Sequence, residues 1–251
     1  MTVWPDGYGR IIRDSVGSTL DEAAHLASVT PDAFWVLAHH QTSARGRRGR
    51  AWSMPEGNFA ATLILRAKEA PGVAALRSFV MSLALCRTLT DVSGDPKDYA
   101  LKWPNDVLLK GGKVAGILLE SAGQGGQLGP LAIGVGVNLR TAPASDAVEA
   151  NSLEPVSLHG QTGVTIDPEP FLDQLARHYA ILENQFLNFG FAPIRTAWLA
   201  QAARLGEPLV ARTGREEIAG VFEDVDETGN LMLRTPLGLR AIAAADVFFT
   251  P

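Results

Sequence analysis

The chain has 251 residues, of which 46% are hydrophobic and 20% charged, and its net charge is −5. A chain of this length can bury roughly three quarters of its unfolded surface, so we expect one large globular domain, alone or with a small appendage. The acidic balance argues against a general nucleic-acid-binding protein, which usually presents a broad basic face. The single cysteine, Cys86, excludes an internal disulfide and a cysteine-based metal cluster, and its apolar neighbours predict that it lies in a helix core.

The start of the chain and its hydropathy give no sign of export or membrane insertion. Residues 1–7 lack a basic start followed by an apolar run, and no apolar stretch approaches the length of a membrane span. His39 and His40 lie at a strand end without a set of partner ligands, so no metal site is predicted. We therefore expect a cytoplasmic protein with no membrane partner.

The first predicted elements surround a loop. Residues 17–27 predict a loop that enters a helix, with Thr19 and Glu22 spaced as a capping box. The apolar runs at residues 33–38 and 58–66 predict two buried strands. The loop at residues 41–50 is therefore expected to connect two core strands, a common position for a binding loop.

The middle of the chain predicts a core helix followed by strands. Residues 74–92 carry apolar side chains at helical spacing, and a Gly-Asp-Pro sequence ends the pattern. Residues 99–109 and 113–120 predict two strands joined in a hairpin at 110–112, with a bulge or distortion caused by Pro104. Residues 131–139 predict another strand, and residues 141–165 predict a long connection with some local helix.

In the last part of the chain, the sequence pattern changes from helical segments to short strand-like runs. Residues 168–189 and 193–204 predict two more helices by their apolar periodicity. After about residue 204 the sequence consists of short strand-like runs between turn residues, at 208–211, 217–222, 231–234 and 239–242. These runs predict a small β-barrel, so we divide the chain into residues 1–203 and residues 204–251.

The loop at residues 41–50 has the composition of an anion-binding loop. It carries four arginines within six residues, and no acidic residue of the loop neutralises them. Arginine presents a planar, permanently charged fork that binds phosphate or carboxylate oxygens in pairs, and Gly46 and Gly49 allow the backbone to approach a ligand closely. A solvated basic loop is the alternative reading of this segment alone.

Two further segments suggest the same chemistry. In an adenylating enzyme, a carboxylate attacks the α-phosphate of ATP, and fixed cations must balance the negative charge that develops. Arg45, Arg47, Arg50 and Lys113 are suited to supply these cations. Asp106 is suited either to orient a hydrogen-bond donor or to help hold magnesium, since Mg²⁺ is usually bound by one or two carboxylates together with substrate phosphates.

The order of these segments resembles that of biotin protein ligases. The matching motifs are Ser18-Thr19, Gln41 to Arg50 followed by Trp52, Lys102-Trp103-Pro104-Asn105-Asp106, Lys113 with Gly116 to Glu120, and Gly134 to Asn138. The resemblance runs through most of the chain, and residues 229–233 resemble the small C-terminal barrel of that family. The combination is specific, because the arginine–glycine run and the Lys-Trp-Pro-Asn-Asp block rarely occur together elsewhere.

The resemblance implies a fold, a reaction and a partner. The implied fold is α/β, a mixed sheet flanked by helices as in class II aminoacyl-tRNA synthetases, with a small SH3-like β-barrel at the C-terminus. The implied enzyme uses biotin and MgATP to form biotinyl-5′-adenylate. It then transfers biotin to a lysine of a biotin carboxyl carrier protein or domain.

The resemblance also assigns roles to individual residues. Those expected to bind biotin are Ser18, Thr19, Gln41, Arg45, Lys113 and Gly116, the last through its backbone. Those expected to bind the nucleotide are Arg47, Arg50, Trp52, Asn105 and Asn138. Lys113 and Arg47 are expected to act in catalysis, together with Asp106, which would polarise the incoming lysine amine. No resident metal ligand is assigned.

Two alternative functions remain open. The first is a ligase for lipoate or octanoate, because those enzymes resemble biotin ligases in fold, although the arginine–glycine loop favours biotin. The second is a non-catalytic module that binds a carrier protein or a nucleotide. That reading would leave Lys102, Asp106 and Lys113 without a function.

The sequence departs from the family pattern at two positions. Ala44 stands where the family usually has glycine, and Leu20 replaces the usual asparagine after Ser-Thr. Each substitution is either silent or reshapes the acyl pocket. The chain has no room before Ser18 for the winged-helix domain of some relatives, so we expect no DNA partner. A homodimer is possible.

Overall fold

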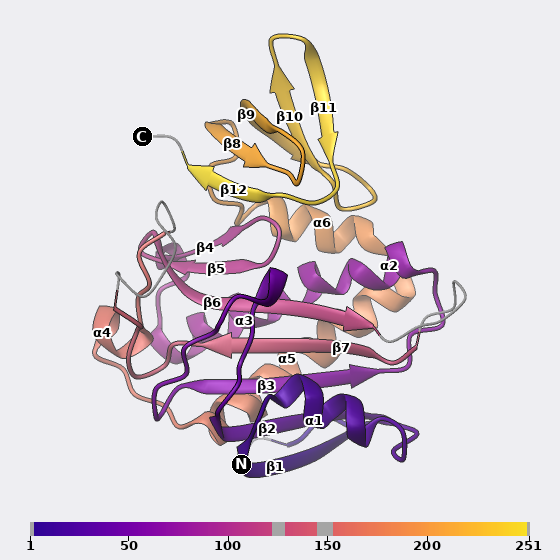
Figure 1. Ribbon diagram of the computed structural model, residues 1–251, viewed down its shortest axis with the longest axis vertical. Coiled ribbons are helices and arrows are strands. Elements are labelled where there is room, and N and C mark those ends of the chain that lie inside the picture. Colours follow the sequence, from indigo (N-terminus) through magenta and orange to yellow (C-terminus); the bar gives the residue numbers. More distant parts are fainter. Residues whose placement is uncertain (1–2, 122–128, 145–152, 250–251) are drawn as a thin grey trace.

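The computed structural model describes residues 3–121, 129–144 and 153–249, and it contains two sheets (Figure 1). The first elements are β1 (Tyr8–Val16), α1 (Thr19–Leu26), β2 (Ala33–Gln41), β3 (Phe59–Leu65), α2 (Pro71–Ala75), α3 (Arg77–Ser93), β4 (Tyr99–Lys102), β5 (Asp106–Leu109), β6 (Gly112–Ser121) and β7 (Leu131–Val137). They are followed by α4 (Leu158–Thr162), α5 (Pro168–Phe189), α6 (Phe191–Leu199), β8 (Pro208–Arg212), β9 (Glu217–Val225), β10 (Leu231–Thr235), β11 (Gly238–Ile242) and β12 (Asp246–Phe249).

The larger sheet is mixed, as predicted. Its seven strands have the order β1-β2-β3-β7-β6-β5-β4, in which β1 and β2 are parallel and the other neighbours antiparallel. Alternating residues of β2 lie on opposite faces. Phe34 and Val36 pack with α1, whereas Trp35 and Leu37 belong to the core that includes α3 and α5. Both faces are therefore covered, which is why residues 33–38 of this strand are continuously apolar.

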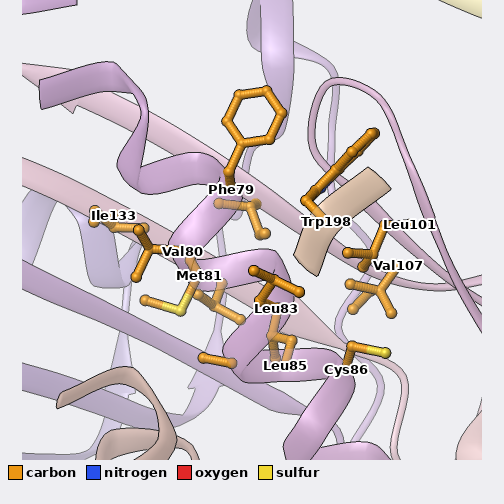
Figure 2. Close-up of a cluster of buried hydrophobic side chains, with 14 of the residues drawn as sticks. Phe79, Val80, Met81, Leu83, Leu85, Cys86, Leu101, Val107, Ile133 and Trp198 are labelled. Carbon is orange, nitrogen blue, oxygen red and sulfur yellow. The ribbon is translucent and has the colours of Figure 1, made fainter. Parts of the chain in front are cut away.

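The main core lies around α3 (Figure 2). Gly94 caps this helix with a left-handed φ of 91°, which confirms the predicted end. Cys86 is 1% exposed, and burial raises the pKa of its thiol to about 12, so its predicted place in the core is also confirmed. Contrary to the sequence reading, the run Pro71–Ser93 is long and apolar enough to cross a membrane, but 72% of its most apolar window is buried inside the protein.

The hairpin at residues 110–112 and the distortion beside Pro104 are confirmed, but two local predictions are wrong and one strand was missed. Helix α1 is capped by Ser18, whose Oγ accepts a hydrogen bond from Leu20 N at 3.2 Å, and not by a Thr19–Glu22 box. Residues 99–109 form two strands, β4 and β5, because the chain turns at 103–105, beside Pro104, so that Lys102 pairs with Asp106. Strand β1 was not predicted, since most of its side chains are only partly buried and it lacks a continuous apolar run.

The second sheet contains five antiparallel strands in the order β11-β10-β9-β8-β12, one more than predicted. It lies over α6 and the β4–β5 edge of the large sheet (Figure 1). Trp103 Nε1 donates to Gly229 O at 3.0 Å, and a Cβ at Gly229 would come within 2.9 Å of Leu76. This close approach fixes the turn between β9 and β10 against the start of α3 and the end of β4. The division at residues 203 and 204 stays a prediction.

Candidate functional site

A cavity of about 640 Å³ lies between the large sheet, the arginine loop and β12. Its walls include every residue that the sequence analysis selected: Ser18, Thr19, Gln41, Arg45, Arg47, Arg50, Trp52, Asn105, Asp106, Lys113, Gly116 and Asn138. These residues come from segments far apart in the chain. The fold therefore brings the candidate site together, while the ligand group that each residue contacts stays a prediction.

One end of the cavity is uncharged and polar. Gln41 Oε1 accepts a hydrogen bond from Thr19 N at 2.7 Å, and Thr62 Oγ1 donates to Thr19 Oγ1 at 2.9 Å. Leu20 is 5% exposed and lies against Gly134, where a Cβ would come within 3.1 Å of its side chain. The substitution at position 20 therefore places an apolar wall next to these polar groups.

A buried carboxylate and two lysines form the charged part of the site. Asp106 Oδ1 lies 2.7 Å from Lys113 Nζ, and Asp106 Oδ2 lies 3.7 Å from Lys102 Nζ. Burial alone would raise the pKa of Asp106, but the positive charges of Lys113 and Lys102 outweigh it and the pKa is lowered. Burial lowers the pKa of Lys102, against the opposing effect of Asp106. The carboxylate is therefore ionised at neutral pH.

The surroundings of Asp106 are positively charged. Its nearest charged neighbours, Lys102 and Lys113, are both cations, and a third cation, Arg47, also lowers its pKa. Among the residues that the structure describes, no group of three or more His, Cys, Asp or Glu side chains is placed to hold a metal ion. Of the two roles considered for Asp106, the arrangement favours the orientation of a hydrogen-bond donor.

The first arginine of the loop is neutralised by acids from other segments. Arg45 donates to both carboxylate oxygens of Asp21 at 2.8 Å, and to Glu120 Oε2 at 2.9 Å. Hydrogen bonds to Asp21 and then to Glu120 raise the pKa of the guanidinium. Arg45 thereby joins the loop to α1 and β6. A contact of Arg45 with biotin stays a prediction.

The remaining arginines of the loop converge on an acid of the second sheet. Asp246 lies 3.4 Å from Arg47, 3.0 Å from Arg48 and 2.6 Å from Arg50. Arg47 also donates to Ala245 O at 3.2 Å from both terminal nitrogens. The loop lacks acids of its own, but the fold supplies them. No local sequence signal identifies Asp246, because it lies about 200 residues from the loop and belongs to the strand that was not predicted.

Trp52 occupies a space that two glycines leave on the sheet. A Cβ at Gly136 would come within 2.6 Å of its indole ring, and a Cβ at Gly116 within 3.2 Å. Lys113 Nζ lies 5.5 Å from the ring centroid. Gly116 is therefore required for the packing of Trp52 and Lys113, and its backbone contact with biotin stays a prediction.

The two asparagines predicted to bind nucleotide use their amide nitrogens within the protein. Asn105 Nδ2 donates to Ile117 O at 2.6 Å, and Asn138 Nδ2 donates to Val156 O at 3.0 Å. Asn138 is 2% exposed. These hydrogen bonds hold the backbone around the cavity. Contact of either side chain with a nucleotide stays a prediction.

The ion pairs of Asp246 should restrain the arginine loop. We expect Asp246→Asn to speed amide hydrogen exchange across residues 45–51 by roughly fivefold, which corresponds to about 1 kcal/mol of lost local stability. Asp224→Asn is the matched control. Asp224 lies in the same sheet as Asp246, but it pairs with Arg195 of α6, away from the loop. Equal exchange in the two variants would show that Asp246 does not order the loop.

Sequence comparison identifies the class of protein. Residues 11–138 match the biotin/lipoate A/B protein ligase family, and residues 205–250 match the biotin protein ligase C-terminal domain. The first match covers half of the chain, and the two follow each other in the order of the two sheets. The chain belongs to the biotin/lipoate A/B protein ligase family.

Individual relatives share nearly the whole chain. A biotin–[acetyl-CoA-carboxylase] ligase of Paracoccus denitrificans is 54% identical over 232 residues, which are 92% of this chain and 97% of the relative. The bifunctional ligase/repressor BirA of Bacillus subtilis is 29% identical, over 96% of this chain and 74% of the relative. A biotin protein ligase of Aquifex aeolicus, solved with biotin and ATP, has a TM-score of 0.83 at 24% identity, over 96% of this chain and 99% of that structure. This likeness confirms the predicted fold class.

Proposed function

We propose that the protein is a biotin–protein ligase, which activates biotin with MgATP and transfers it to a lysine of a biotin carboxyl carrier domain. The observation that carries the proposal is a single cavity with a polar end around Gln41 and a charged end around Lys113. A bicyclic urea and a carboxylate at opposite ends of one ligand match these two ends. The Paracoccus relative, named for the same reaction, supports the assignment.

In the first step, an oxygen of the biotin carboxylate attacks the α-phosphorus of ATP. The bond from phosphorus to the bridging oxygen breaks, pyrophosphate leaves, and biotinyl-5′-adenylate remains. Negative charge on the phosphoryl oxygens increases in the transition state, so a fixed cation stabilises that state most. Lys113 and Arg47 supply such cations from two walls of the cavity. Mg²⁺ enters with ATP and carries part of the phosphate charge.

In the second step, the amine of the carrier lysine attacks the acyl carbon of the adenylate. A C–N bond forms, the C–O bond to AMP breaks, and the amine loses a proton. Asp106, ionised between its two lysines, accepts a hydrogen bond from the incoming amine and aligns it. Its lowered pKa makes it a weak base, so this role is to position and polarise the amine.

The polar end of the cavity supports biotin over the other acyl acids. Octanoate and lipoate would place a hydrocarbon chain or a dithiolane ring against the Thr19 hydroxyl, which accepts from Thr62, and against Gln41 Nε2, which donates to the weak acceptor Met54 Sδ at 3.3 Å. A polar group that is buried without a hydrogen-bond partner costs about 1–3 kcal/mol, so these acids are disfavoured. The ion pair between Asp106 and Lys113 supports an active enzyme over a simple binding module, because it keeps a cation and an anion at fixed positions in the cavity.

A panel of acids tests the proposal. Purified protein is incubated with MgATP and biotin, lipoate or octanoate, and the products are identified by mass spectrometry. We expect an adenylate of biotin and at least about tenfold less of either other acid. A lipoyl or octanoyl adenylate as the main product would mean that Leu20 and Ala44 have changed the acyl pocket. Absence of any adenylate would favour the non-catalytic alternative.

Three properties of the protein extend the proposal. It acts in the cytoplasm, it contacts no membrane, and it does not bind DNA, in keeping with a net charge of −5. The pairing of all four loop arginines with acids of the same chain supports the last point. A gel shift with operator-like DNA tests it. Sedimentation would determine whether the protein is a monomer or a homodimer.

A further inference from the structure

At Lys113, the segment that pairs with one edge of β6 is no longer β7. Strand β7 ends at Val137, and its last pairing with β6 is Val137 with Ala115. Beyond that point a different segment continues the sheet beside β6. Lys113 N donates to Glu154 O at 2.8 Å, and Val156 N donates to Lys113 O at 3.0 Å. On the other side, Lys113 pairs with Leu108 of β5. The backbone of Lys113 is therefore held on both sides.

Asn138 connects the end of β7 to this segment. Its Nδ2 donates to Val156 O at 3.0 Å, its backbone N donates to Val114 O at 2.9 Å, and its backbone O accepts from Leu158 N at 2.8 Å. Asn138 thus binds Val156, which donates to Lys113, and Val114, which follows Lys113 in the chain. The side chain of Asn138 is buried, so its loss would leave Val156 O without this donor.

Close packing adds to this arrangement. A Cβ at Gly112 would come within 2.3 Å of Val156 Cγ1 and 3.0 Å of Glu154 O. The segment therefore lies directly against the start of β6, and no side chain fits between them. The position of Lys113 therefore depends on this contact and on Asn138, both of which involve Val156.

We propose that Asn138 is a positioning residue for Lys113, acting through the Glu154–Val156 segment. This inference rests on the proposed function, since it concerns the cation of the adenylation step. A lysine side chain is a flexible stem with a point charge, so the fixed backbone, the ion pair with Asp106 and the indole of Trp52 together determine where its ammonium lies. A displacement of about 1 Å at a reacting centre can cost on the order of a hundredfold in rate.

The test compares two buried asparagines with the same local function. Asn58 is also 2% exposed, and it holds Thr141 O at 2.7 Å and Arg140 N at 2.9 Å, away from the cavity. We expect Asn138→Ala to lower kcat for adenylate formation by about tenfold to a hundredfold, a larger factor than any rise in the KM for ATP. Asn58→Ala is expected to leave both constants near those of the wild type.

A double variant separates positioning from general damage. In a Lys113→Ala background, Asn138→Ala should cause almost no further loss of kcat, because the group it positions is already absent. Full additivity would overturn the proposal. A raised KM for ATP with unchanged kcat would also overturn it and would assign Asn138 to nucleotide binding instead.

A second variant reaches the same segment without altering Asn138. Gly112→Ala pushes against Val156, and it should reproduce the loss of kcat if the segment positions Lys113. The Gly112→Ala variant replaces Asn138→Ala in the test if circular dichroism shows that Asn138→Ala does not fold. A normal kcat in a folded Gly112→Ala protein would overturn the proposal. If the wild type forms no adenylate, the proposed function fails, whereas an active wild type with equal Asn58→Ala and Asn138→Ala variants refutes only this inference.

Discussion

Lys113→Ala is expected to slow the formation of biotinyl-adenylate by about a hundredfold to a thousandfold, the usual effect of removing a preorganised group that stabilises transition-state charge. The ammonium lies 2.7 Å from Asp106 and borders the cavity beside the indole of Trp52. Pyrophosphate release in a single turnover measures the rate. Because the charge on phosphate increases in the transition state, the loss should fall on kcat more than on the KM for ATP.

The neighbouring Lys110 provides the control for this variant. It lies on the same hairpin, is exposed and pairs with Asp98 at 3.5 Å, outside the cavity. Lys110→Ala should therefore change the rate less than about twofold, within the range of an exposed ion pair. An unchanged rate in a Lys113→Ala protein with a normal melting curve would remove Lys113 from the mechanism.

Asp106→Asn is expected to slow the transfer of biotin to the carrier lysine by about a hundredfold, the loss that follows when the group that aligns an attacking atom is removed. The amide keeps the shape of the side chain but cannot offer two anionic oxygens to an amine. Adenylate formation should also fall, because the ion pair that orients the Lys113 ammonium is lost, but by less than transfer, because Lys113 and Arg47 keep their charges. Preformed biotinyl-adenylate and the carrier domain are mixed, and transfer is followed by mass spectrometry. A larger loss in the first step than in transfer would contradict the assigned role.

The direction of the Asp106 pKa shift predicts the pH dependence of the same step. Because the pKa of Asp106 is lowered, its carboxylate stays ionised from pH 8 down to about pH 5. This whole range lies above the usual Asp pKa of about 3.9. Its protonation therefore cannot cause a loss of transfer rate in this range. A carboxyl whose pKa is lower in the folded protein than in the unfolded chain stabilises the fold at pH values above its unfolded-state pKa. This stability is lost as the pH falls through the folded-state pKa. Asp98→Asn, which alters a half-buried acid paired with Lys110, should leave the profile unchanged.

The sequence was sufficient for most of the catalytic region because its signals are local. Apolar runs and helical spacing predicted β2, β3, α3 and α5, since both faces of the sheet are covered and the pattern is uninterrupted. The ordered motifs also selected twelve residues that all line the cavity. Strands with partly exposed side chains gave no such signal, and β1 and β12 were missed for that reason.

Residue types and motif order, which the chain carries by itself, determined the family and the mixed sheet and selected residues that line one cavity. Pairings between distant segments were decided only in the tertiary structure. Asp246 reaches the arginine loop, Asn138 binds Val156, and Asp106 lies between two lysines. The physical reason is that an ion pair or a side-chain hydrogen bond requires atoms within about 3–4 Å, and spacing along the chain gives no measure of that distance once the segments belong to different strands.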